Sequence, residues 1–169
     1  MKRIVINECY GGFGLSIDAL YLLLRLGFPL NSYPLEKSGY TLQDFNLEGP
    51  EGIRGMTRGR CLLKDDTVYS FDSGSGRPED DALRSHPALV KVVEMLGKRA
   101  GTDYANLVIE ELESDAVYRI EEYDGMESVR PLSTADYTAG HDYVEPALPP
   151  DMQIAGEVQM LSGPVKLLS

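Results

Sequence analysis

A glycine-rich turn at residues 10–16 joins the first apolar run of the chain to the first helical pattern. Such a turn can present backbone N–H groups at the positive end of a helix dipole, which suits a phosphate or a carboxylate. The turn lacks the Gly-Lys-Ser/Thr ending of a P-loop and the glycine spacing of a dinucleotide-binding loop. A tight strand-to-helix reversal, with Phe13 and Leu15 packed into the core, explains the same glycines, so both interpretations stay open.

Three arginines stand close together between Gly52 and Arg60, in a chain that is otherwise acidic. Guanidinium groups in a flexible glycine setting can clamp a phosphate or carboxylate in bidentate geometry. They can equally pair with the surplus carboxylates of the surface. If the chain binds a small anion, the sequence predicts a site built from both segments. Its ligand-binding residues are Tyr10, Gly11, Gly12, Gly14, Ser16, Arg54, Arg58 and Arg60.

Cys9 lies just before the turn, where a helix N-terminus can activate a thiol as a nucleophile. The sequence places neither of its two histidines, His86 and His141, near Cys9, so the usual base is missing. A buried structural cysteine is the alternative, because cysteine is among the most buried residue types. No catalytic residue is therefore assigned.

Carboxylates gather around an Asp-Gly pair, at Glu121, Glu122, Asp124 and Glu127. They suggest a metal site or an acid–base pair, although a solvated hairpin tip explains them as well. A two-residue loop at Asp124–Gly125 places Glu122 opposite Glu127, a like-charge pair that needs a cation or a basic group to neutralise it. Serine hydrolase, kinase and zinc-hydrolase signatures are absent, and the sequence assigns no metal and no cofactor.

The formal net charge of −11 over 169 residues repels nucleic acid phosphates and anionic membrane surfaces. Direct binding to nucleic acid or to a membrane is therefore disfavoured, whereas an acidic surface that imitates nucleic acid stays open. The longest apolar run, 17–30, is interrupted by Asp18 and Arg25 and is too short to span a bilayer. Without a signal-peptide pattern at the start, we expect a cytoplasmic protein.

The elements that must position these residues predict an α+β fold. We expect a buried strand at 2–7, a helix from Ser16 to Gly27 and a second helix beginning at Ser85. Strands at 106–112, 116–123 and 126–130 follow, and a hairpin around Asp65–Asp66 and a loop at 72–80 precede the second helix. The prediction is a mostly antiparallel sheet with two main helices packed on it. Residues 1–130 form the domain, and 131–169 form an extended C-terminal segment or arm.

Two segments of the chain have a distinctive sequence. They are Ile6-Asn7-x-Cys9-Tyr10-Gly11-Gly12-Phe13-Gly14-Leu15-Ser16 and the series Arg84-Ser85-His86-Pro87-Ala88-Leu89-Val90, Glu94-Met95-Leu96-Gly97, Tyr104-Ala105-x-Leu107 and Ile120-Glu121-Glu122-Tyr123-Asp124-Gly125-x-Glu127. In these segments the chain resembles a widespread family of small proteins encoded by tailed bacteriophages. The resemblance implies a phage origin and a host-cell cytoplasmic location, but no activity, and residues 131–169 depart from the family pattern.

Three functions remain open at this point. The first is non-enzymatic binding of a host or defence protein or of a small phosphorylated ligand, and it agrees with what the resemblance implies for a phage accessory protein. The second is a nucleotide-processing or group-transfer enzyme that uses Cys9 or the hairpin carboxylates. The third is an acidic nucleic-acid mimic that occupies a basic host protein. Self-association into a homo-oligomer stays open for each.

Overall fold

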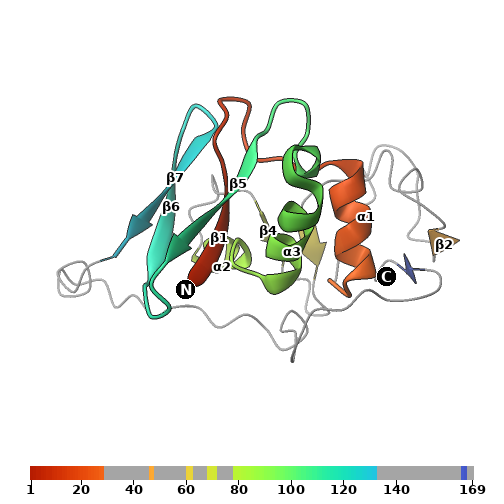
Figure 1. Ribbon diagram of the computed structural model, residues 1–169, viewed down its shortest axis with the longest axis horizontal. Helices are drawn as coiled ribbons and strands as arrows, with labels where there is room; N and C mark the ends of the chain where they lie inside the picture. Colours follow the sequence, from red (N-terminus) through yellow and green to blue (C-terminus); the bar gives the residue numbers. More distant parts are fainter. Residues whose placement is uncertain (29–45, 48–59, 63–67, 72–77, 133–164, 167–169) are drawn as a thin grey trace.

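The computed structural model describes residues 1–28, 46–47, 60–62, 68–71, 78–132 and 165–166 (Figure 1). These residues form an α+β fold, as the sequence predicts, and the strands pair as separate antiparallel two-stranded ladders rather than as one larger sheet. Two ladders are six residue pairs long, and one of them, β1–β5, lies between the long helices and the other (Figure 1). Within the described ranges, none of the helices combines the length and the apolar character that a membrane crossing requires.

The central ladder pairs β1 (Lys2–Asn7) with β5 (Leu107–Leu112), with Val5 opposite Ile109. Val5 packs into the cluster formed with the helices, while Ile4 and Ile6 pack into a second cluster on the other face. Both faces of β1 are therefore buried. That is why its sequence is a continuous apolar run rather than an alternating one.

The first helix, α1 (Ile17–Arg25), begins and ends as its sequence predicts. The Ser16 hydroxyl caps the helix by accepting a hydrogen bond from the Ala19 amide at 3.1 Å. Gly27, with φ of 80°, follows the last turn in the left-handed region that glycine tolerates. The apolar residues of α1 face the core.

The second long helix, α3 (Pro87–Leu96), packs on β1 and β5, and α1 packs against it. A 3₁₀ turn, η3 (Gly97–Ala100), continues its course. The helix begins two residues later than predicted from Ser85, because the capping residue is His86, whose Nδ1 accepts from the Ala88 amide at 3.1 Å.

The second long ladder is the hairpin of β6 (Tyr118–Tyr123) and β7 (Met126–Pro131). Asp124 and Gly125 form its two-residue loop with φ of 51° and 87°, as the Asp-Gly signal predicts. The hairpin covers the face of β1 that the helices leave open, which gives three layers (Figure 1). The residues at this contact are Ile4, Ile6, Val108, Leu112, Tyr118, Ile120 and Val129.

A short helix, α2 (Pro78–Leu83), occupies part of the segment expected to be a loop at 72–80. Its sequence has the signature of a helix start, proline at the first position followed by Glu79, Asp80 and Asp81 in the first turn. The helix matters because it delivers Asp81 and the following Arg84 to the interior, where both are buried.

A short ladder pairs β3 (Arg60–Leu62) with β4 (Val68–Ser70), and Arg60 lies opposite Ser70. The predicted two-residue loop at Asp65–Asp66 would instead pair Arg60 with Phe71, so that register is wrong. Phe71 lies in the core, with its ring 5.4 Å from that of Phe28, and the pairing ends before it.

The other short ladder pairs β2 (Asn46–Leu47) with β8 (Val165–Lys166). It joins a piece of the C-terminal segment to the part of the chain that precedes residue 130. The rest of 131–169 beyond Leu132 lies outside the described residues, so the division into a domain and an arm stays a prediction.

Candidate functional site

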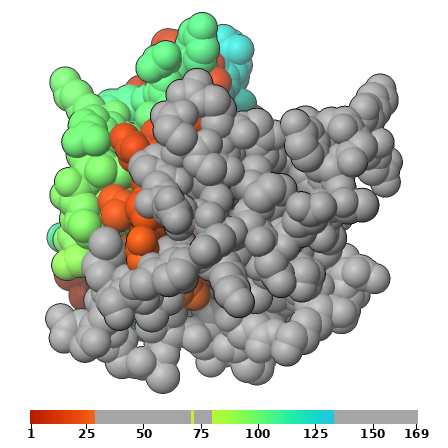
Figure 2. Space-filling view, turned by 90° about the vertical axis from the view of Figure 1, so that its right-hand side faces the viewer, coloured from red at the N-terminus to blue at the C-terminus, as the bar shows by residue number. Residues whose placement is uncertain are grey.

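Three loops meet at one end of the molecule, at the top of Figures 1 and 2. They are residues 8–14 after β1, residues 101–106 before β5, and residues 122–126 at the tip of the β6–β7 hairpin. We call them the three-loop cap. The cap contains four of the residues that the sequence predicts to bind a ligand, Tyr10, Gly11, Gly12 and Gly14.

Glycines allow the backbones of these loops to touch. A Cβ atom at Gly11 would clash with the backbone of Tyr104, and one at Gly125 would lie 2.5 Å from the Gly12 nitrogen. At both positions the neighbouring backbone leaves no room for a side chain, so the close approach requires glycine. The tight reversal predicted as the alternative use of the glycines is therefore present, with Leu15 buried in the core and Phe13 partly buried against it.

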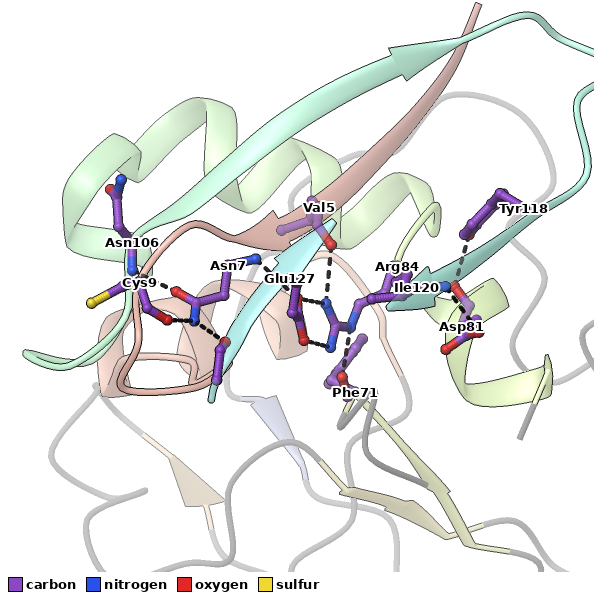
Figure 3. A network of polar contacts seen from close by, with 11 residues as sticks. Val5, Asn7, Cys9, Phe71, Asp81, Arg84, Asn106, Tyr118, Ile120 and Glu127 are labelled. Atoms are coloured by element: carbon purple, nitrogen blue, oxygen red, sulfur yellow. Dashed lines mark hydrogen bonds and ion pairs between the residues drawn. The ribbon is translucent and has the colours of Figure 1, made fainter. Parts of the chain in front are cut away.

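Asn7, at the end of β1, connects all three loops (Figure 3). Its side-chain nitrogen donates to the carbonyls of Cys9 at 2.6 Å and Gly125 at 2.8 Å. Its side-chain oxygen accepts from the Asn106 amide at 2.8 Å. Asn7 is fully buried, and its three hydrogen bonds fix the loops relative to one another.

A buried ion pair anchors this arrangement (Figure 3). Glu127 accepts two parallel hydrogen bonds from the Arg84 guanidinium, at 2.6 Å and 2.8 Å. The same carboxylate accepts a hydrogen bond from the backbone N–H of Asn7 at 2.9 Å. The ion pair is therefore bonded directly to the residue that joins the loops. The two side chains are 0% and 1% exposed, which makes loss of either partner costly.

Arg84 also completes the edge of β1 that faces away from β5. Its Nη1 donates to the Val5 carbonyl at 3.2 Å, and its own carbonyl accepts from the Val5 amide at 2.9 Å. Its Nε donates to the Phe71 carbonyl at 2.5 Å, and the guanidinium carbon lies 3.6 Å from the centre of the Phe13 ring. One side chain therefore holds together segments from four parts of the sequence.

The like-charge pair predicted in the hairpin is present, and Arg84 neutralises one of its two carboxylates. Glu122 lies opposite Glu127 in the register, as expected. Glu127 turns inward to Arg84, whereas exposed Glu122 accepts from the Gly125 amide at 2.6 Å. Arg84 is the residue of this network that sequence reasoning missed, because its partner is 43 positions away.

A second buried carboxylate, Asp81, fastens α2 to β6 (Figure 3). Its Oδ2 accepts from Arg119 Nε at 2.8 Å and from the Ile120 amide at 3.2 Å. Within the described part of the chain, its Oδ1 has no hydrogen-bond partner. Burial raises the pKa of Asp81, and the hydrogen bonds and positive charges around it oppose that rise only in part.

The outer surface of the cap is aromatic and acidic. Tyr10, Tyr104 and Tyr123 are 62%, 74% and 81% exposed, and they are three of the five large apolar residues exposed in the described ranges. Residues 8–14, 101–106 and 122–126 contain no lysine, arginine or histidine. Their carboxylates, all on exposed residues, are Glu8, Asp103, Glu122 and Asp124.

The remaining predicted ligand-binding residues lie elsewhere. The Ser16 hydroxyl caps α1 and donates to the Arg99 carbonyl at 2.6 Å. Arg60 is placed only as a backbone position of β3, and Arg54 and Arg58 lie outside the described residues. The proposed meeting of the glycine turn with the arginine cluster stays a prediction.

The structure adds no catalytic partner for Cys9 among the residues it describes. His86 is buried at the start of α3, with its ring 4.7 Å from that of Phe28, and His141 lies outside the described ranges. In those ranges no three histidine, cysteine or acidic side chains gather as metal ligands. The half-buried Cys9 contributes its carbonyl to the Asn7 network.

Comparison of the chain with protein-family models, with curated proteins and with solved structures gives no match. The resemblance to bacteriophage proteins therefore stays a prediction from the two sequence segments. The geometry of the three-loop cap is the basis for a functional proposal.

Proposed function

We propose that this chain is a phage accessory protein that acts without catalysis, by binding a host or defence protein through the three-loop cap. The observation that carries the proposal is the group of three exposed tyrosines on loops joined by buried hydrogen bonds. Tyrosine is enriched at protein interfaces because its ring gives a large apolar contact and its hydroxyl gives a polar one.

The buried network supports this proposal because it prepares the cap for binding. A loop that orders only on association loses binding free energy to conformational entropy. Asn7, Glu127 and the cap glycines hold the three loops together before any partner arrives. The expected location is the cytoplasm of the host cell, where such a partner would be met.

A small phosphorylated ligand is the second candidate. A hollow of about 540 Å³ lies beside the cap, and its lining includes Ser16, Lys98 and Arg99. Arg99 is paired with Asp18 at 3.2 Å, and Asp103 also lines the hollow, so its charge is mixed. Titration with inorganic phosphate and nucleotides, followed by calorimetry, separates this candidate from a protein partner.

The enzyme alternative keeps Cys9 as its nucleophile. Replacing Cys9 by Ser would abolish any turnover under that mechanism, whereas binding through the cap would continue. We expect the Cys9→Ser variant to bind the partner as tightly as the original chain does.

The main test is a tyrosine-to-alanine variant of the cap, with Tyr10, Tyr104 and Tyr123 replaced together. Interface tyrosines that are hot spots contribute about 2 kcal/mol or more each, so partner affinity should fall at least about 100-fold. The matched control is Met95→Ala, which removes an exposed apolar side chain from α3. Partner capture from host extract and calorimetry with the captured protein supply the readout.

Equal capture by the tyrosine variant and the original chain would overturn the proposal. Thermal unfolding of both variants shows whether any loss is a folding effect, because exposed tyrosines contribute little to the core.

A further inference from the structure

We infer that the three-loop cap recognises an arginine-rich segment of its protein partner. This inference rests on the proposed function and adds the chemistry of the partner. It follows from two properties of the cap, the sign of its charges and the type of its exposed rings.

The first property is that the charged side chains within the three loops are all carboxylates, although Lys98 and Arg99 line the neighbouring hollow. Exposed Glu8, Asp103, Glu122 and Asp124 are spread over all three loops, and no basic residue stands among them. A basic partner segment would gain carboxylate contacts from every loop, whereas an acidic one would be repelled. A guanidinium can engage a carboxylate through two parallel hydrogen bonds, which an ammonium cannot do.

The second property is the set of exposed tyrosines. A guanidinium stacks on an aromatic face and keeps its edge hydrogen bonds, so tyrosine beside carboxylate favours arginine over lysine. A related pairing of arginine with tyrosine occurs within the chain. The Arg25 guanidinium carbon lies 5.2 Å from the Tyr21 ring centre, and Arg25 Nη2 donates to the Tyr21 hydroxyl at 2.7 Å.

The overall charge of −11 attracts any polycation, so the test must separate the cap from the general field. The β5–β6 loop, residues 113–117, lies at the opposite end of the β-strands from the cap and carries exposed Glu113 and Asp115 without a tyrosine (Figure 1). Reversing two charges there changes the net charge as much as reversing two in the cap.

The experiment measures binding of fluorescent nona-arginine and nona-lysine by anisotropy at several salt concentrations. The variants are Glu8→Lys with Asp103→Lys in the cap, and Glu113→Lys with Asp115→Lys as the matched control. We expect the cap variant to weaken nona-arginine binding at least about tenfold and the control to change it less than about twofold. In the variant with the three tyrosines replaced by alanine, nona-arginine and nona-lysine should bind with similar affinity, because the preference for arginine depends on the tyrosine rings.

Equal weakening by the two charge variants would overturn the inference, and so would equal binding of nona-lysine and nona-arginine by the original chain. Either result leaves the proposed function intact if the tyrosine variant still loses its captured partner. Conversely, a tyrosine variant that keeps its partner removes the proposed function whatever the peptides do.

Discussion

At the scale of single residues, Arg84 shows how much of this fold depends on one buried charge. It pairs with Glu127, closes the edge of β1 through Val5, and covers the Phe13 ring. The sequence offers no local sign of this role, because each partner comes from a distant part of the chain. A buried arginine is recognisable only once its surroundings are known.

The pair predicts strong energetic coupling. Arg84→Met leaves the Glu127 carboxylate buried without its cation, and Glu127→Leu leaves a buried guanidinium, so each should lower the free energy of unfolding by about 3–5 kcal/mol. The double variant removes both charges and should lose at least about 2 kcal/mol less than the two single losses combined. Urea unfolding of the four proteins gives the cycle.

The double variant should still be less stable than the original chain, because the Asn7 amide and the Val5 and Phe71 carbonyls lose their partners. Arg130→Ala is the control, since the Arg130–Glu121 pair is about half exposed and should contribute less than about 1 kcal/mol. Additive losses at Arg84 and Glu127 would contradict the assigned coupling.

At the scale of elements, the sequence predicts those helix ends and turns that depend on interactions between neighbouring residues. Ser16 caps α1, and Asp124–Gly125 turns the second long hairpin, because each signal acts within a few residues. The register of β3 and β4 differs from the one that a two-residue loop at Asp65–Asp66 predicts, since Arg60 lies opposite Ser70 rather than opposite Phe71, which is buried. The meeting of three loops could not be predicted, since it depends on how whole elements pack.

The cap glycines allow a matched test of loop packing. Gly12 and Gly125 have nearly equal φ of 88° and 87°, but a Cβ at Gly12 meets nothing within 4 Å, whereas one at Gly125 clashes with Tyr10 and Gly12. Alanine at either position carries backbone strain on the order of 1–2 kcal/mol. Gly125→Ala adds the clash, so it should cost at least about 1 kcal/mol more than Gly12→Ala.

Chemical denaturation measures the difference, and amide exchange at residues 8–14 reports whether the loop is displaced. Equal losses in the two variants would show that the hairpin tip does not need its close contact with the turn.

At the scale of the whole molecule, the three layers place the exposed aromatic residues at one end and bury the charges that position them. The sequence predicts the α+β class from its apolar periodicity and an acidic surface from its composition. It does not give the hollow, the cap or the Arg84 network, because these arise where distant segments meet.

The free energy of unfolding should depend on pH in part through Asp81. Its raised folded pKa means that the folded protein binds this proton more tightly than the unfolded chain does. The contribution of Asp81 to stability is therefore fully present below the unfolded pKa and is lost as pH rises through the raised folded value. Asp81→Asn removes this dependence.

We expect the stability of the original chain relative to Asp81→Asn to decrease as pH increases across that interval, measured by urea unfolding at a series of pH values. Asp115→Asn, at an exposed position, is the control. A difference between the original chain and Asp81→Asn that stays constant with pH would contradict the role of burial at Asp81.

The outward edge of β1 has a wider consequence. An open strand edge can template the addition of strands from other molecules, which leads to aggregation or domain exchange. Here a guanidinium, a carboxylate and a turn carbonyl occupy the positions at Val5 and Asn7 that an intruding strand would need. Displacing them would leave two opposite charges buried without a partner. The ion pair that positions the loops therefore also opposes the addition of a strand from another molecule to this edge of β1.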